Sequence, residues 1–302
     1  MRRFMRDVTS SSGGCIDENL IRSVTEELYS AALRKVPDDT KAALASAIED
    51  ESEEAAKGAL KLMLKSAKLA EEKDAFVCSD SGVPVYLLEI GGRARWEGDI
   101  NAAIRRGFDH LVATIQPPLL QHVANPLTNE RKYGGKGMPL VSVELKGDGE
   151  YIDITCVPKA LGSGRWTAIK TFISPSLMDM EAFVLDFMIE SGQQICPPVV
   201  VGVGIGGSFD VAARLATKAT YRDIGSVNEE GALADMERRL KRAINQIGYG
   251  PMGTGGKTTA MAVHVDYSYG HGYTPVAVCV NCWINRRTKA RLFNDGRVER
   301  LM

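Results

Sequence analysis

Apolar residues in the first quarter of the chain recur at helical spacing. Ile21, Val24 and Leu28 lie three or four residues apart, as on the buried face of a helix. Pro37 is followed by two aspartates, an order typical of the start of a second helix. A third run, over residues 55–69, is rich in Ala, Glu and Lys, which favour helices. The pattern predicts a helical block over residues 18–74 with a role in packing or in subunit contact.

After residue 75 the pattern changes to short apolar runs bounded by Gly, Pro and Asn, which predict strands. Strands are expected over residues 83–90, 140–145, 151–157, 199–203, 258–267 and 275–282, and helices over 99–110, 179–190, 208–220 and 229–247. The Lys146-Gly-Asp-Gly149 turn indicates a hairpin between the second and third of these strands. Residues 116–138 have the composition of a long loop. We therefore expect a mixed α/β fold, in which the helical block precedes a mixed sheet with flanking helices.

The composition is that of an ordinary globular chain. Of its 302 residues, 44% are hydrophobic and 25% charged, and the formal net charge is -1. This balance gives no electrostatic case for binding nucleic acid or an anionic membrane surface. No apolar run approaches the ~20 residues of a membrane span. We expect one domain over residues 1–302, made of the helical block 18–74 and a second part over residues 75–294.

The sequence contains six cysteines, and its N-terminus does not resemble a secretory signal. Residues 1–7 are basic but lack the apolar stretch of a signal peptide. Six cysteines are too few for a disulfide framework in a chain of this length, so we expect reduced thiols and a cytoplasmic protein. A single cysteine is most often a small core residue, so a site needs further signals.

Cys196 stands in the most distinctive stretch of the chain. Two prolines follow it, and because they fix φ and remove backbone donors, Cys196 must end the preceding helix. A short strand then leads into glycines at positions 202, 204, 206 and 207, where the backbone could approach a ligand closely. Ser208 is placed to cap the next helix. The thiol and the glycines could form two walls of one site.

Two glycine-rich loops also suggest nucleotide binding, but the context of each argues against it. Residues 202–207 follow a strand, as in a dinucleotide-binding turn, yet the region about 20 residues further on is predicted helix instead of a strand ending in an acid. In the loop over residues 250–258, Pro251 stands where a phosphate loop has glycine. A nicotinamide oxidoreductase is therefore the less favoured alternative. Either loop could still bind a small anion through backbone N–H groups.

The remaining candidates each have an ordinary explanation. Cys279 and Cys282 have metal-like spacing without a second pair, and in a strand they would point to opposite faces, which favours Cys282 as a ligand. His271, between glycines in an exposed turn, is either a surface residue or part of a site. Asp80 is most often a turn residue. The Arg286–Arg287 pair is either solvated or a carboxylate anchor.

Six segments, taken together, resemble the alpha-subunit type of iron–sulfur hydro-lyase, the family of class I fumarate hydratases and L(+)-tartrate dehydratases. They cover residues 36–39, 78–82, 159–163, 196–207, 250–259 and 282–287, and they occur in the family's order. Each alone is weak, but three cysteine motifs together with both glycine loops are specific. The resemblance implies that glycine-rich loops converge on a cluster site.

The resemblance implies a [4Fe–4S] cluster held by Cys78, Cys196 and Cys282. Three protein ligands leave one iron open, which can act as a Lewis acid in the reversible dehydration of a 2-hydroxydicarboxylate of the malate/fumarate or tartrate type. It also implies that Ser79 and Asp80 lie at the substrate, Asp80 as a catalytic residue.

Three further site residues follow from the same resemblance. Gly162 and Ser163 would direct donors at a substrate carboxylate. His271 matches a catalytic histidine that the neighbouring subunit contributes.

Two departures from the family pattern leave the substrate open. Ser79 replaces a glutamine. Leu111-Val112 stands where the family has a leucine followed by a carboxylate-binding arginine, and Arg131 or Lys136 are candidate substitutes.

The resemblance also implies partners. The chain ends about 20 residues after Cys282, so the family's second catalytic half would come from a separately encoded beta subunit, with a homodimer of alpha chains as the expected assembly. The alternative, motivated by the departures, is a non-catalytic cluster-binding or assembly subunit of the same fold.

Overall fold

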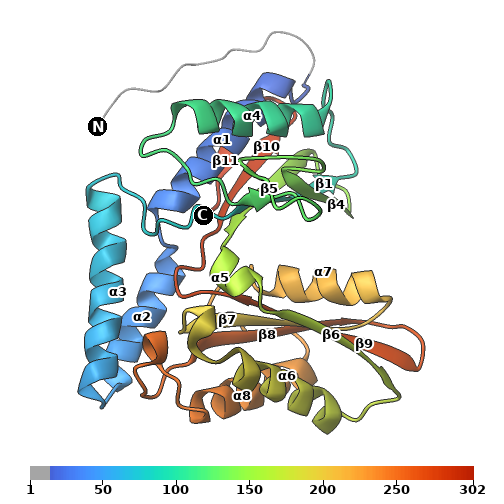
Figure 1. Cartoon of the computed structure of the whole chain (residues 1–302). Coiled ribbons are helices and arrows are strands. Elements are labelled where there is room, and N and C mark those ends of the chain that lie inside the picture. Colours follow the sequence, from blue (N-terminus) through green and yellow to red (C-terminus); the bar gives the residue numbers. More distant parts are fainter. Residues whose placement is uncertain (1–13) are drawn as a thin grey trace. The chain divides into compact units, whose positions relative to one another are not determined.

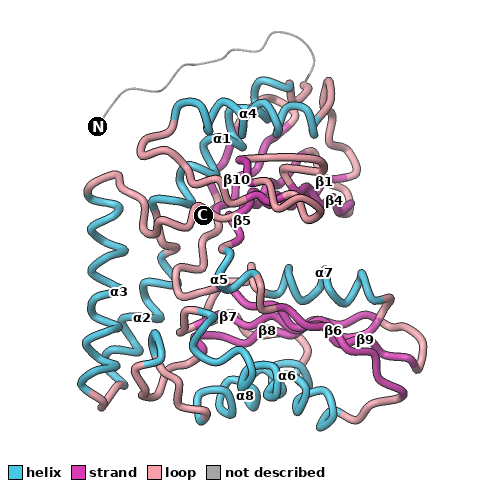
Figure 2. The backbone as a smooth tube through the Cα atoms, viewed as in Figure 1, coloured by secondary structure: helices cyan, strands magenta, loops and turns pink. Residues whose placement is uncertain are grey.

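The computed structural model describes residues 14–302, so the basic segment at residues 1–7 lies outside the described part. The chain forms two compact units. Within the described residues, the first comprises residues 14–32, Val83–Pro158 and Arg287–Met302, and the second comprises Leu33–Gly82 and Lys159–Arg286. Their elements are shown in Figures 1 and 2. None of the helices within residues 14–302 has both the length and the apolar character to cross a membrane.

The predicted helical block consists of three helices, α1 (Glu18–Arg34), α2 (Asp38–Asp50) and α3 (Glu54–Glu72). Their apolar faces follow the periodicity of the sequence. In the second unit, Leu44 of α2 and Leu60 of α3 are fully buried and share a core with Val200 and Met261. The helical block thus has the packing role expected of it.

The first unit contains a five-stranded sheet with the order β11-β10-β5-β1-β4. Its strands are β1 (Val83–Gly91), β4 (Leu140–Lys146), β5 (Tyr151–Lys159), β10 (Thr288–Phe293) and β11 (Val298–Arg300). Helix α4 (Ile100–Thr114) begins at Asp99, whose carboxylate accepts the Ala102 N–H at 3.0 Å. Within the predicted loop 116–138, β2 (Val123–Ala124) and β3 (Arg131–Lys132) form a small ribbon.

The predicted hairpin between β4 and β5 is wrong. The glycine turn at residues 147–149 reverses the chain, but β1 lies between the two strands and pairs in parallel with β4. A turn signal is local, whereas strand order depends on burial: β1 and β5 are both almost wholly buried and lie inside the sheet, and the largely exposed β4 forms its edge. Strand β5 pairs instead with β10, from the end of the chain.

The second unit contains a four-stranded sheet with the order β6-β9-β7-β8. Its strands are β6 (Thr167–Ile173), β7 (Val199–Gly206), β8 (Ala260–Ser268) and β9 (Tyr273–Asn281), with β7 parallel to β8 and antiparallel to β9. Helix α7 (Phe209–Ala219) covers one face, and α6 (Leu177–Ser191) and α8 (Gly231–Gln246) cover the other, as Figure 1 shows.

The alternation of valine and glycine in β7 explains these two faces. Val201 and Val203 pack into the core shared with α6 and α8. The glycines face α7, where an added Cβ would lie 2.0 Å from the Ala216 oxygen at Gly202, and 2.1 Å from the Ala212 oxygen at Gly204. These glycines therefore admit a close helix and not a nucleotide or a substrate.

The glycine turn after β7 also differs from the prediction. Gly206 and Gly207 have φ of 79° and 65°, and an added Cβ at Gly206 would lie 2.2 Å from the Ser268 oxygen. Ser208 does occupy the N-cap of α7, but its hydroxyl donates to the Asp210 carboxylate at 2.5 Å and forms no capping bond to the backbone.

Candidate active site at the three thiols

Cys196 and Cys282 meet because β7 and β9 are antiparallel neighbours. Cys196 follows the short helix η1 (Gly192–Ile195) and precedes β7, and Cys282 directly follows β9. The pairing of Val200 with Asn281 places the start of β7 beside the end of β9. The Trp283 N–H then donates to the Cys196 carbonyl at 3.2 Å. Two thiols distant in sequence are thereby brought to one end of the sheet of the second unit.

Cys78 joins this pair from the turn after α3. It packs with Cys196 and Cys282 in one apolar group that also contains Val36 and Ile284. Burial raises the pKa of the Cys196 thiol, and the neighbouring Cys282 and Cys78 thiols and the Asp80 carboxylate raise it further. Because this repulsion acts only over short distances, it reports the same grouping as the packing does.

The backbone at Cys196 adopts a conformation that residues other than glycine rarely take. Its φ and ψ are 54° and 63°, in the left-handed region. Met252, in the helix η2 (Pro251–Gly253), has a φ of 54° as well, and its N–H donates to the Pro197 carbonyl at 2.9 Å. Such strain persists where the surrounding structure imposes it, and it is common at functional sites. The glycine loop that contains Met252 therefore supports the cysteine segment.

Ser79 and Asp80 lie beside the first thiol. Ser79 is exposed, and Asp80 is half-buried. The Asp80 carboxylate accepts the Gly82 N–H at 2.8 Å, so it closes a local turn, while its backbone carbonyl accepts from Arg286 Nη1. Asp80 is thus a turn residue, as expected of an aspartate at this position. The same turn orients the Asp80 carboxylate near the thiols.

Gly162 and Ser163 belong to α5 (Leu161–Gly164) and lie next to the second thiol. A Cβ added at Gly162 would lie 3.8 Å from the Cys196 sulfur. Ser163 is 1% exposed, and its hydroxyl has no hydrogen-bond partner within residues 14–302. The structure thus brings together seven of the eight predicted site residues, which are Cys78, Ser79, Asp80, Gly162, Ser163, Cys196 and Cys282.

His271 is the site residue that a single chain does not bring to the thiols. It lies in the exposed turn between β8 and β9, stacked on Tyr273 with ring centroids 5.0 Å apart. Cys282 follows the other end of β9, a strand of nine residues. At about 3.3 Å per residue, His271 is about 27 Å or more from the thiols of its own chain.

Among residues 14–302, no group of three or more His, Cys, Asp and Glu side chains is close enough to hold a single metal ion. A cubane cluster makes a different demand, because each thiolate binds a different iron and the sulfurs need not converge on one point. The donor set fits such a group: three free, partly or fully buried thiols lie in one apolar group of residues.

Two features of the site were not expected from the sequence. The solvated interpretation of the arginine pair is wrong, because Arg286 is 4% and Arg287 2% exposed. Glu51 is 3% exposed, and its carboxylate accepts the N–H groups of Ser52, Glu53 and Lys257 at 2.7–3.0 Å, which ties the glycine loop to the link between α2 and α3. The burial of these charged side chains depends on tertiary packing and leaves no local pattern in the sequence.

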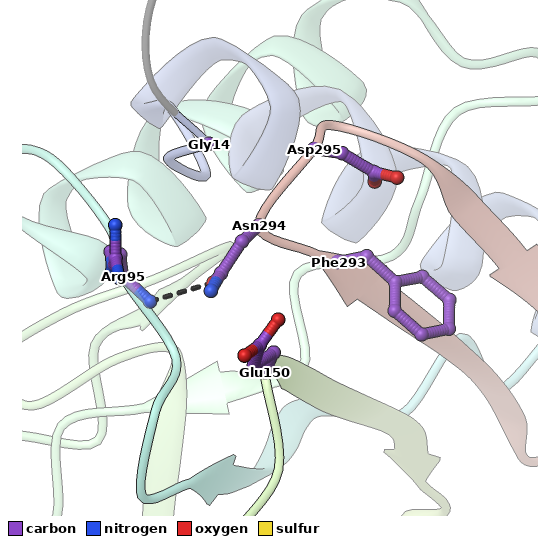
Figure 3. A pocket seen from close by; sticks show the side chains of 6 residues that line it. All are labelled: Gly14, Arg95, Glu150, Phe293, Asn294 and Asp295. Atoms are coloured by element: carbon purple, nitrogen blue, oxygen red, sulfur yellow. Dashed lines mark hydrogen bonds between the residues drawn. The ribbon is translucent and has the colours of Figure 1, made fainter.

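The candidate substitutes for the family's arginine belong to the first unit. Leu111 is in α4, Arg131 is in β3, and Lys136 follows it. The first unit also contains the pocket in Figure 3, of about 290 Å³, lined by Gly14, Arg95, Glu150, Phe293, Asn294 and Asp295. Its dashed bond joins the Arg95 N–H to Asn294 Oδ1 at 2.8 Å. The pocket has charges of both signs and none of the predicted site residues.

Comparisons with known proteins agree with the resemblance drawn from the motifs. The model of the fumarate hydratase (Fumerase) family matches residues 22–291. A Methanocaldococcus jannaschii protein provisionally named L(+)-tartrate dehydratase subunit alpha is 36% identical over 286 residues, or 92% of this chain and 99% of that protein. The L(+)-tartrate dehydratase subunit alpha of Escherichia coli K12 is 28% identical over 289 residues, 94% of each chain. The chain therefore belongs to the fumarate hydratase family of hydro-lyases.

Proposed function

We propose that the chain is the alpha subunit of a hydro-lyase that uses a [4Fe–4S] cluster to dehydrate a 2-hydroxydicarboxylate. The observation that carries the proposal is the meeting of Cys78, Cys196 and Cys282 at one end of the sheet in the second unit. The family and the names of the relatives support a substrate of the malate/fumarate or tartrate type.

The three thiols would hold the cluster. Burial and mutual repulsion raise the pKa of Cys196, so the thiolate form needs a nearby positive charge, which bound iron provides. When bound, the cluster would supply Lewis acidity at an open iron and so make the substrate hydroxyl a better leaving group. The apolar residues around the thiols would limit access of water.

Side chains next to the thiols would bind and orient the substrate. The exposed Ser79 hydroxyl replaces the family's glutamine as a donor, and the Ser163 hydroxyl is free to donate to a carboxylate. The Asp80 carboxylate, oriented by the Gly82 N–H, would hold a proton at the departing hydroxyl oxygen. Small Gly162 leaves room for the substrate beside Cys196.

His271 would act in the site of a second copy of the chain, because it lies too far from the thiols of its own. The tip that carries it is unusually apolar: Tyr269 is 89%, Ile173 78% and Phe209 70% exposed. Such a patch is typical of an interface. The exposed tip therefore supports a homodimer of alpha chains in which each tip completes the partner's site.

A separately encoded beta subunit would supply the base and further carboxylate-binding groups. The names of the relatives as alpha subunits support this assembly, and reduced thiols suit a cytoplasmic protein. The test is purification without oxygen, quantification of iron and sulfide, and a screen of 2-hydroxydicarboxylates with and without the beta subunit. We expect turnover only in the complex, and turnover by the cluster-loaded chain alone would refute the need for a partner.

The departures at Ser79 and Leu111-Val112 motivate a second candidate, a cluster-binding or assembly subunit without catalysis. The same experiment decides between them. A complex that contains the cluster but turns over none of the dicarboxylates would favour the second candidate.

A further inference from the structure

Arg286 connects two of the three cysteine segments. It lies beyond a turn in which the Asn285 N–H donates to the Cys282 carbonyl at 2.9 Å. Its guanidinium Nη1 donates to the backbone carbonyl of Asp80, two residues after Cys78. The side chain is 4% exposed. The charged end of Arg286 is therefore held beside the Cys78 turn, next to the thiols.

The other end of this guanidinium lacks a partner. Nη2 is buried and has no hydrogen-bond acceptor within residues 14–302. The acceptor of Nη1 is a neutral carbonyl, so this contact does not neutralise the charge. A buried arginine in this state is costly unless an anion completes it.

Lys159, the cation that precedes α5, is in a different state. Its amino group donates to the Val280 carbonyl at 2.5 Å and to Asn281 Oδ1 at 2.7 Å. Its hydrogen-bonding capacity is thus largely used within the protein. Compared with the partly buried Lys159, Arg286 is the cation with hydrogen-bonding capacity left for a ligand.

A second unpartnered donor lies near the same group of thiols. The Ser163 hydroxyl is buried and unpaired within the described residues, and the neighbouring Gly162 approaches the Cys196 sulfur. Two unsatisfied buried donors beside one group of thiols are unusual, because buried polar atoms in folded proteins are nearly always paired. Their presence indicates that an anion belongs beside the thiols.

We propose that Arg286 Nη2 binds the substrate carboxylate remote from the reacting hydroxyl, with the Ser163 hydroxyl as a second donor. This inference rests on the proposed function and deepens it, since it assigns the carboxylate anchor that Leu111-Val112 leaves vacant in the family pattern. Arginine is suited to this role because it stays charged and directs its N–H groups rigidly.

The test compares two probes that differ by one carboxylate, L-malate and L-lactate. The cluster-loaded chain is titrated with each, and binding is followed by the change in cluster absorbance. We expect Arg286→Gln to weaken malate binding by about ten- to a hundredfold and lactate binding by less than about twofold. Arg286→Lys should recover part of the loss, and Ser163→Ala should weaken malate binding by about three- to tenfold.

Arg222→Gln is the matched control, because Arg222 is also partly buried in the second unit but pairs with Glu237 at 2.6 Å. It should leave both affinities unchanged. A malate affinity within about twofold of wild type in Arg286→Gln, with full cluster absorbance, would overturn the inference. Equal losses for malate and lactate would assign Arg286 a purely structural role and overturn it too.

A further measurement separates this inference from the proposed function. If the wild-type chain acquires no cluster, the proposed function fails, and the cluster-free chain is then titrated with succinate while tryptophan emission is recorded. Binding that Arg286→Lys weakens and Arg222→Gln does not would support the anion site by itself. If wild type binds no succinate, or if Arg286→Lys binds it as well as wild type does, the anion site is refuted.

Discussion

Gly204→Ala tests whether the glycines of β7 exist to admit α7. An added Cβ would lie 2.1 Å from the Ala212 oxygen and 2.5 Å from the Ala216 nitrogen. Both are backbone atoms of α7, which cannot rotate away as a side chain could, so the helix must move off the sheet. Overpacking in a core costs about 1–3 kcal/mol, and we expect the upper end, about 3 kcal/mol. In a unit of this size that lowers Tm by roughly 6–12 °C.

Gly58→Ala is the control, because Gly58 is exposed inside α3 and an added Cβ would have no atom within 4 Å. Removing a glycine from a helix interior should stabilise the chain by about 0.5–1 kcal/mol. The assay is urea unfolding of the cluster-free chain, followed by tryptophan emission. A Gly204→Ala variant within about 0.5 kcal/mol of wild type would refute the packing role of these glycines.

Three further predictions concern the support of the site and the buried thiols. Glu51→Gln should lower the free energy of unfolding by about 1–3 kcal/mol, because the Glu51 carboxylate accepts three backbone N–H groups. Glu49→Gln is the control and should have no effect, because Glu49 is exposed. Urea unfolding measures both variants. Burial opposes ionisation of Glu51, but the N–H groups of residues 53, 257 and 52 outweigh it and lower its pKa. This stabilisation should therefore be complete above the ordinary value of 4.5 and disappear as the pH falls through the lowered pKa, so that wild type and Glu51→Gln converge in acid. Burial raises the pKa of the fully buried Cys156 thiol, so iodoacetamide should modify it only after unfolding, and labelling in the folded chain at neutral pH would contradict this placement.

Elements with a strong local pattern could be predicted from the sequence. The helical block, the strand that begins at Val199 and the helices on either side of it follow from apolar periodicity and from turn residues, although the strand continues to Gly206, three residues beyond its predicted end. The partners of the strands could not be predicted this way. The turn at residues 147–149 indicated a hairpin, yet β1 separates the two strands, because the buried β1 and β5 pair inside the sheet and the exposed β4 lies at its edge.

At the site, too, local features could be predicted from the sequence, whereas contacts between distant segments could not. The break at Cys196 followed from the two prolines, but its meeting with Cys78 and Cys282 depends on the antiparallel pairing of β7 and β9 and was expected only from the family resemblance. The glycines after Cys196 suggested a ligand, whereas Gly202 and Gly204 approach atoms of α7 and Gly206 approaches Ser268 of β8. The arginine pair fitted a solvated role and a carboxylate anchor equally well in the sequence, and only the burial of Arg286, on which the anion site rests, decides between them.

The iron and sulfide content of the chain purified without oxygen tests the central claim most directly. We predict about four irons and four sulfides per chain, with broad absorbance near roughly 400 nm. Cys78→Ser, Cys196→Ser and Cys282→Ser should each lose this content. Cys279→Ser is the control and should retain the iron and sulfide, because the buried Cys279 thiol accepts a hydrogen bond from Lys159 and is not one of the three proposed ligands. A wild-type chain without iron, or a Cys196→Ser variant with the full content, would contradict the account.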